Sequence, residues 1–159
     1  MSPEHPNATL IQRFYEAFDR GDADSMAAAY APGVVFSYPA FGELRGDDAR
    51  EMWRRRCSNA TDLSVEARDI SADDSTGRAH WTARYTFGTG RKVVNEIDAR
   101  FRFEDGRIVE HHDSFSLWRW SRQALGPAAF VVATNPMGRK ALRRSVRGRL
   151  TAWKEGRGE

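Results

Sequence analysis

The stretch NEIDARFRFEDGRIVEHHD, residues 95–113, decides the architecture that this sequence predicts. As far as Phe103, apolar and charged side chains alternate, which is the pattern of a strand with one buried face. The dipeptide Asp105-Gly106 then marks a tight hairpin turn. We therefore expect a long strand that turns back on itself, with its partner strand running to about Trp118. The inward face of the first strand would carry Asn95, Ile97, Ala99, Phe101 and Phe103.

Other strands are expected before this hairpin, because the same period of two recurs upstream. One run begins at Leu63, and another covers residues 79–87 before Gly88-Thr89-Gly90 turns the chain. A shorter apolar run over residues 34–38 predicts one more strand. Most of the body after residue 60 should therefore be sheet.

The N-terminal third shows helical spacing instead. Apolar residues recur every three or four positions from Leu10 to Phe18, and Thr9 with Gln12 fits a capping box that would begin this helix. The helix should end at Gly21, which is the residue type most common just after a helix.

Two more helices are expected before the sheet. The second, capped by Asp22 or Asp24, would run through Tyr30 and stop at Pro32, since the residue before a proline avoids helical geometry. The third would begin near Asp47. Its apolar face would consist of Ala49, Met52, Trp53 and Cys57.

Together these elements predict an α+β domain, in which a curved and mostly antiparallel sheet wraps around N-terminal helices. We expect residues 1–133 to form this domain with its pocket. Residues 134–159 would add a basic amphipathic C-terminal helix packed on the same domain, because eight basic residues there stand against two acids. Its apolar stripe, within a helix over residues 137–153, would be Leu142, Val146, Leu150 and Trp153.

Composition fits one globular domain of 159 residues, with 40% hydrophobic and 30% charged residues. No apolar stretch approaches the length of a membrane span, and residues 1–7 lack the features of a signal peptide, so we expect a cytoplasmic protein without a membrane partner. Cys57 is the only cysteine, which makes an internal disulfide impossible and gives no zinc-site spacing. We expect neither a metal nor an organic cofactor.

Two segments resemble a known superfamily: FYEAFDRGD, residues 14–22, and FRFEDGRIVEHHD, residues 101–113. They are similar to the nuclear transport factor 2-like superfamily, in its SnoaL-like and ketosteroid-isomerase-like branches. The resemblance spans roughly residues 8–118. It implies a cone in which sheet and helices enclose a cavity, and a homodimer formed through the outer face of the sheet.

The resemblance favours the cyclase branch over the isomerase branch. Where the isomerase pattern has a tyrosine and two aspartates, this chain has Phe14, Tyr38 and Ala99. A one-residue shift would bring Asp98 to the last position but onto the outer face, so we expect that machinery to be absent. The His-Trp-Asp run of SnoaL-like cyclases corresponds here to residues 111–113, with the aspartate retained. Epoxide hydrolases of the superfamily need an inward arginine with two inward carboxylates, and the strand at residues 95–101 offers neither.

Asp113 is the one carboxylate that strand alternation places inside. Period two groups His111, Asp113 and Phe115 with Val109 on the inward face and sends His112 outward. A poorly solvated carboxylate beside aromatic walls suits a general base near neutral pH, and His111 could orient it or share its proton. Alternatively, the acid and the histidine are satisfied core residues that hydrogen-bond each other.

Aromatic side chains would line the cavity and hold a flat hydrophobic ligand, or simply fill the core. Asn95 is polar on an apolar face, so it either anchors a ligand or satisfies a β-bulge. The predicted substrate-binding residues are Tyr15, Phe36, Tyr38, Trp53, Trp81, Tyr85, Asn95, Phe101 and Phe115.

The outward row on the long strand, from Glu96 to Arg102, predicts cross-strand ion pairs or the rim of a dimer. Three functions follow from the sequence. The first is a cofactor-independent acid/base enzyme, of cyclase, isomerase, hydratase or hydrolase type, that uses Asp113 on a hydrophobic small molecule. The second is a binding module without chemistry. The third is an accessory protein acting through its basic tail, although nucleic acid is an unlikely partner for a helix with a single aromatic residue.

Overall fold

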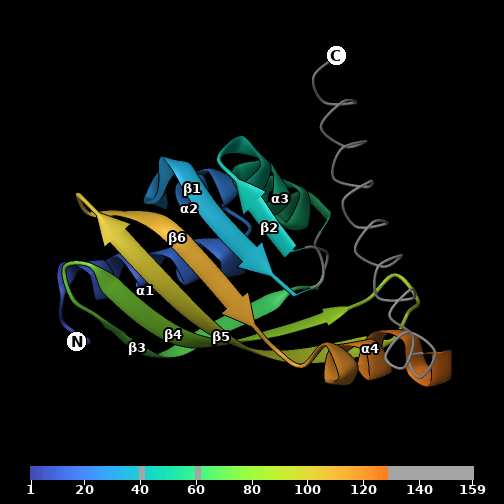
Figure 1. Cartoon of the computed structure of the whole chain (residues 1–159). Helices are drawn as coiled ribbons and strands as arrows, with labels where there is room; N and C mark the ends of the chain where they lie inside the picture. Colours follow the sequence, from blue (N-terminus) through green and yellow to red (C-terminus); the bar gives the residue numbers. More distant parts are fainter. Residues whose placement is uncertain (40–41, 60–61, 129–159) are drawn as a thin grey trace, which may run out of the picture.

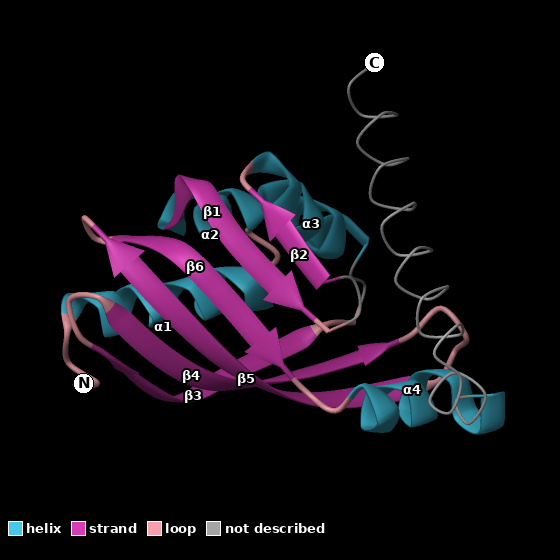
Figure 2. Cartoon of the chain, in the orientation of Figure 1, coloured by secondary structure: helices cyan, strands magenta, loops and turns pink. Residues whose placement is uncertain are grey.

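A computed structural model describes residues 1–39, 42–59 and 62–128. Figures 1 and 2 show the N-terminal helices lying against one side of a strongly curved sheet. In chain order the elements are α1 (Pro6–Asp19), α2 (Ala23–Ala29), β1 (Tyr30–Tyr38), β2 (Gly42–Arg45), α3 (Asp47–Asn59), β3 (Ser64–Ala72), β4 (Thr76–Thr86), β5 (Lys92–Glu104), β6 (Arg107–Ser114), α4 (Leu117–Leu125) and a short 3₁₀ turn (Gly126–Ala128).

The six strands form one sheet in the order β2-β1-β6-β5-β4-β3. Only β1 and β6 are parallel neighbours, and the other pairs are antiparallel. This confirms the expected α+β class and the mostly antiparallel, curved sheet. A single core joins the helices to the inner face of the sheet, with Phe14 and Phe18 of α1 packing against Trp53 of α3 and Trp81 of β4.

The β5–β6 hairpin agrees with the prediction from the sequence along β5 and through its turn. Burial alternates without error along β5 from Val93 to Phe103. Asp105 and Gly106 have φ of 51° and 74°, which is the left-handed pair that a two-residue type I′ turn requires. The turn therefore returns the chain in register, with Phe103 opposite Ile108.

A β-bulge lies just beyond this turn, and it corrects one expectation. Arg102 pairs with Glu110 while Phe103 pairs with Ile108, so Val109 is an extra residue in β6. Val109 does not face inward as predicted; it lines a hollow on the outer face together with Glu110. The inward residue before the bulge is Ile108, which is fully buried.

After the bulge, the faces of β6 are as the sequence predicts. His111 pairs with Phe101 and Asp113 with Ala99, both of which point into the core. His112 lies on the other face, where its Nδ1 is 2.6 Å from Ser37 Oγ. The bulge is thus the feature that brings His111 and Asp113 to the inside.

The structure contradicts the predicted start of the first helix and confirms that of the second. Thr9 lies within α1, which begins three residues earlier; its N-cap is His5, whose ring accepts a hydrogen bond from the Asn7 amide. Asp22 does cap α2, accepting from the Ser25 amide. The second helix ends at Ala29, and Tyr30 opens β1 instead of closing the helix.

The C-terminal part of the described chain also differs from expectation. Strand β6 ends at Ser114, and Ser116 caps α4, which occupies residues expected to complete the strand. The short strand β2 had no clear signal in the sequence. The predicted helix over residues 137–153, and with it the proposed segment 134–159, lies outside the described residues. Within residues 1–39, 42–59 and 62–128, no helix combines the length and apolarity needed to cross a membrane.

Charged side chains on the outer face of the sheet form the cross-strand pairs that were expected. His80 of β4 places Nε2 2.6 Å from Glu96 and Nδ1 2.8 Å from Asp98, both on β5. Arg68 of β3 reaches the same Glu96 carboxylate at 3.1 Å, and Arg102 pairs with Glu110 of β6. The ion pairs are therefore confirmed, whereas the dimer remains a prediction.

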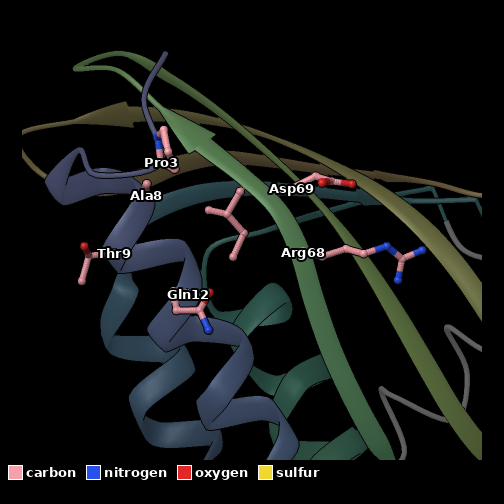
Figure 3. Close-up of a pocket in the computed structure, with 7 residues that line it drawn as sticks. Pro3, Ala8, Thr9, Gln12, Arg68 and Asp69 are labelled. Carbon is pink, nitrogen blue, oxygen red and sulfur yellow. The ribbon is translucent and has the colours of Figure 1, made fainter.

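Strand β3 is one of the two edge strands of the sheet, and a second irregularity lies there. Its pairing with β4 shifts between Arg68 and Ser71, and Asp69 has φ of 55°. A hollow of about 410 Å³ separates this edge from α1 (Figure 3). Its lining consists of Pro3, Ala8, Thr9, Gln12, Arg68, Asp69 and Ile70, none of which is a predicted site residue.

Candidate functional site

A chain of buried polar side chains crosses the aromatic core and ends at Asp113. Trp53 Nε1 of α3 donates to Tyr30 Oη at 2.8 Å. Tyr30 Oη lies 2.8 Å from His111 Nδ1, and His111 Nε2 lies 2.9 Å from Asp113 Oδ1. The chain links α3, β1 and β6, so the carboxylate is oriented by three separate elements.

This arrangement determines where the proton of His111 sits. Tyr30 Oη already accepts from Trp53, so its own proton is available for the unprotonated Nδ1. In neutral His111, Nε2 then carries the hydrogen and donates to Asp113, with Tyr15 Oη a more distant neighbour at 3.4 Å. The histidine therefore presents a donor, and not a lone pair, to the carboxylate.

The two oxygens of Asp113 differ in their surroundings. Oδ1 receives the His111 hydrogen bond and lies 3.4 Å from Trp81 Nε1. Oδ2 is buried and has no hydrogen-bond partner among the described residues. Buried carboxylate oxygens almost always have a partner, so an open oxygen on a side chain that is 0% exposed needs an explanation.

The tyrosines near the carboxylate stay protonated. Burial is the main cause that raises the pKa of Tyr15 well above its ordinary value, and the charge of Asp113 adds to it. Burial likewise raises the pKa of Tyr30, against the opposing hydrogen bond from Trp53. Both hydroxyls are therefore hydrogen donors at neutral pH and not bases.

Aromatic rings enclose His111 on several sides. The Phe101 ring stacks on it with centroids 4.4 Å apart, Phe36 meets it edge-on at 5.0 Å, and Trp53 lies parallel at 6.2 Å. These three predicted lining residues are thus brought together around the histidine. Contact with a ligand remains a prediction for each of them.

A second polar group, which the sequence reading missed, lies next to Tyr38. Arg56 Nη2 of α3 donates to Tyr38 Oη at 3.0 Å, and its guanidinium lies over the Tyr38 ring at 5.0 Å and the Trp53 ring at 5.8 Å. Tyr38 also contacts Phe115, with centroids 5.0 Å apart. Phe115 follows β6 two residues after Asp113, so this cationic group and the carboxylate border the same part of the interior.

Asn95 and Tyr85 lie along the β4–β5 part of the site. The β4–β5 pairing runs unbroken and places Asn95 opposite Ala83, so the alternative that Asn95 satisfies a bulge is wrong. Its side chain is buried and forms no hydrogen bond with any described residue. Tyr85 Oη accepts a hydrogen bond from Trp120 Nε1 of α4 at 2.6 Å, so α4 is linked to this part of the site.

Comparison with protein families agrees with the fold. The model of the SnoaL-like domain matches residues 11–111. The chain belongs to the SnoaL-like domain family. A comparison with curated proteins found no significant match.

Solved structures of several proteins share this fold. A proposed polyketide cyclase from Xanthomonas campestris pv. campestris is 27% identical with a TM-score of 0.63, covering 77% of this chain and 98% of that one. An LEH-like epoxide hydrolase from M. tuberculosis is 24% identical with a TM-score of 0.65, covering 80% of this chain and 96% of that one. A second proposed polyketide cyclase, from Streptomyces antibioticus, is 24% identical with a TM-score of 0.64, covering 75% and 98%.

Two site residues of this SnoaL-like domain escaped sequence reasoning. Arg56 lies seven residues after Ala49, at the spacing of the apolar stripe that includes Met52 and Trp53, so its position on the inner face was available as a signal. Tyr30 gave a misleading signal because it continues the helical spacing of α2. Its strand role depends on pairing with β6, which is distant in sequence.

Proposed function

We propose that this SnoaL-like protein binds a hydrophobic small molecule in its interior and transfers a proton with Asp113. The observation that carries the proposal is that Oδ2 of this fully buried carboxylate has no hydrogen-bond partner within residues 1–39, 42–59 and 62–128. A proton on a substrate carbon or oxygen placed beside Oδ2 would supply the missing partner. Family membership supports a pocket for small molecules, and similarity to proposed polyketide cyclases supports proton-transfer chemistry.

The proposed step needs only the groups already present. Oδ2 takes the proton from a carbon next to a carbonyl group, and the electron pair of the broken C–H bond moves onto the substrate as an enolate. The protonated Asp113 then returns the proton to the enolate, or to another position of it. Because the His111 Nε2–H holds Oδ1, the carboxylate keeps Oδ2 aimed at the substrate throughout.

The test measures proton exchange, so it does not require the natural substrate. Flat cyclic ketones such as tetralone and anthrone are incubated with the protein in D₂O, and deuterium uptake beside the carbonyl is followed by NMR. General base catalysis contributes about 10²–10⁴-fold, so Asp113→Asn should slow the catalysed uptake by about that factor. The matched control is Asp98→Asn, because Asp98 lies on the outer face of β5.

Two results would contradict the proposal: uptake at the uncatalysed rate for ketones that bind, or equal catalysed rates in the wild type and Asp113→Asn. The first would favour the second candidate, a ligand-binding module without chemistry. Close packing of Phe36, Trp53 and Phe101 around His111 favours that candidate, since it gives the histidine a structural role. Saturable thermal stabilisation by the ketones, with no deuterium uptake, would establish it.

A further inference from the structure

Arg56 carries a positive charge into the aromatic core without a described carboxylate to match it. It is only partly exposed, and the one hydrogen bond that it forms with a described residue goes to the hydroxyl of Tyr38. Arg56 forms no ion pair with any of the described residues. A guanidinium has five N–H donors, so the part of the chain that the structure describes uses only a fraction of its hydrogen-bonding capacity.

The other arginines on α3 that pair with acids provide a contrast. Arg50 reaches Asp47 at 2.6 Å, and Arg54 reaches Glu51 at 2.7 Å, each one turn back along the helix. Arg56 lies over two aromatic faces instead, at Tyr38 and Trp53. Aromatic faces stabilise a cation without neutralising it, so Arg56 remains able to bind an anion.

We propose that Arg56, with Tyr38 beside it, forms a binding subsite for an anionic oxygen of the small molecule, either a carboxylate or an ionised hydroxyl on a flat ring system. The inference deepens the proposed function, because the ligand is the one that Asp113 would act upon. The guanidinium fork matches a carboxylate in two-point geometry, and the rings of Tyr38 and Trp53 provide flat apolar surfaces for an aromatic ligand.

The electrostatics around Arg56 agree with a persistent cation. Burial acts to lower the pKa of the guanidinium, but the oxygens of Tyr38 and Tyr85 and the charge of Asp113 more than offset it, so the pKa is raised. The carboxylate of Asp113 repels an anionic oxygen, whereas Arg56 attracts it. The ligand should therefore bind in one orientation, with its charged oxygen at Arg56 and an uncharged C–H at Asp113.

Three naphthalene probes of similar size test the subsite by titration calorimetry at neutral pH. Naphthoate carries a carboxylate, a nitronaphthol carries an ionised hydroxyl, and naphthamide is neutral. Wild-type protein should bind at least one of the two anions about tenfold or more tightly than the amide. Whichever anion is favoured identifies the source of the charged oxygen.

Substitutions then assign the preference to Arg56. Arg56→Met should remove the preference, lowering affinity for the favoured anion about tenfold while the amide changes less than about twofold. Arg56→Lys should retain part of it, because the charge remains but the planar fork is lost. Arg13→Met is the control for the loss of one positive charge, since Arg13 is exposed on α1 and should leave all three affinities unchanged.

The outcomes also separate this inference from the proposed catalysis. Asp113→Asn should keep the anion preference even where it abolishes deuterium uptake. Equal wild-type affinity for anions and amide, or no binding of any probe at millimolar concentration, would overturn the subsite. Equal weakening of all probes by Arg56→Met, together with a lower melting temperature, would also overturn it by showing that Arg56 only supports the fold.

Discussion

The hydroxyl of Tyr30 lies 2.8 Å from Nδ1 of His111, and the two residues belong to β1 and β6, the parallel neighbours of the sheet. This contact makes His111 Nδ1 a hydrogen-bond acceptor and leaves Nε2 to donate to Asp113. The backbone of two strands and the indole of Trp53 hold it in place. Proton placement at the candidate site is therefore set by the fold before any ligand binds.

Tyr30→Phe tests this relationship. The substitution keeps the ring but leaves the Trp53 indole N–H and His111 Nδ1 without their buried partner, so we expect a loss of about 1–3 kcal/mol in unfolding free energy. His111 would no longer be fixed in one tautomer, which nitrogen-15 NMR of the ring reports directly. Deuterium uptake should fall about tenfold, by less than in Asp113→Asn. An unchanged tautomer would show that Asp113 alone orients the histidine.

Stability should depend on pH through His80 on the outer face. Hydrogen bonds with Glu96 and then Asp98 raise the pKa of His80, while burial and the nearby Arg68 oppose the shift. The folded protein therefore holds this proton more tightly than the unfolded chain, whose histidine titrates near about 6.5. The contribution is complete below that pH and disappears as the pH rises through the raised value.

His80→Gln measures this contribution. Urea unfolding of wild type and variant should differ most at about pH 6 and converge at about pH 9. The same cluster lowers the pKa of Glu96 to about 2, chiefly through His80. The contribution of Glu96 is therefore complete above its unfolded pKa of about 4.3 and is lost as the pH falls from there towards the lowered value. A difference between the two proteins that stays constant from pH 6 to 9 would contradict the assigned role of His80.

Gly77 of β4 is expected to be intolerant of a side chain. A Cβ at this position would lie 2.8 Å from Phe103 and 2.9 Å from Ile11, both fully packed in the core. Overpacking costs about 1–3 kcal/mol, so Gly77→Ala should lower the melting temperature by several degrees. Gly33→Ala is the control, because nothing lies within 4 Å of its Cβ. Equal stability of the two variants would mean that α1 packs less closely on the sheet than described.

Homodimerisation through the outer sheet face remains a prediction. Arg84 and Arg100 are exposed on β4 and β5, on the same sheet face as Glu96 and Asp98. Light scattering at micromolar concentration should give twice the mass of 18.0 kDa. Reversing both arginine charges should then release monomers, since like charges would face each other across the interface. A monomeric wild type would leave these charges as solvated surface pairs.

The sequence predicted those elements whose signal is local. Alternation along β5 and the Asp105-Gly106 turn were correct because strand period and turn geometry depend on neighbouring residues. Tyr30 and Arg56 were missed because their roles depend on contacts with His111 and Tyr38, which are remote in the chain. Asp113 was placed correctly, although the reason given, an inward Val109, was wrong.

The bulge at Val109 carries a consequence for how such a site is gained or lost. If Val109 were kept but paired regularly opposite Arg102, the register would run from Phe103 opposite Ile108 to Arg100 opposite His111 and Asp98 opposite Asp113, the last two pairs facing outward. His112 would then turn inward. Deleting the Val109 codon, in contrast, would leave Glu110 opposite Arg102 and Asp113 opposite Ala99, so the buried carboxylate survives loss of the extra residue. Deleting a residue between Val109 and Asp113 while the bulge is kept would instead turn the carboxylate to the surface, so the position of a deletion in this hairpin decides whether the site is kept or lost.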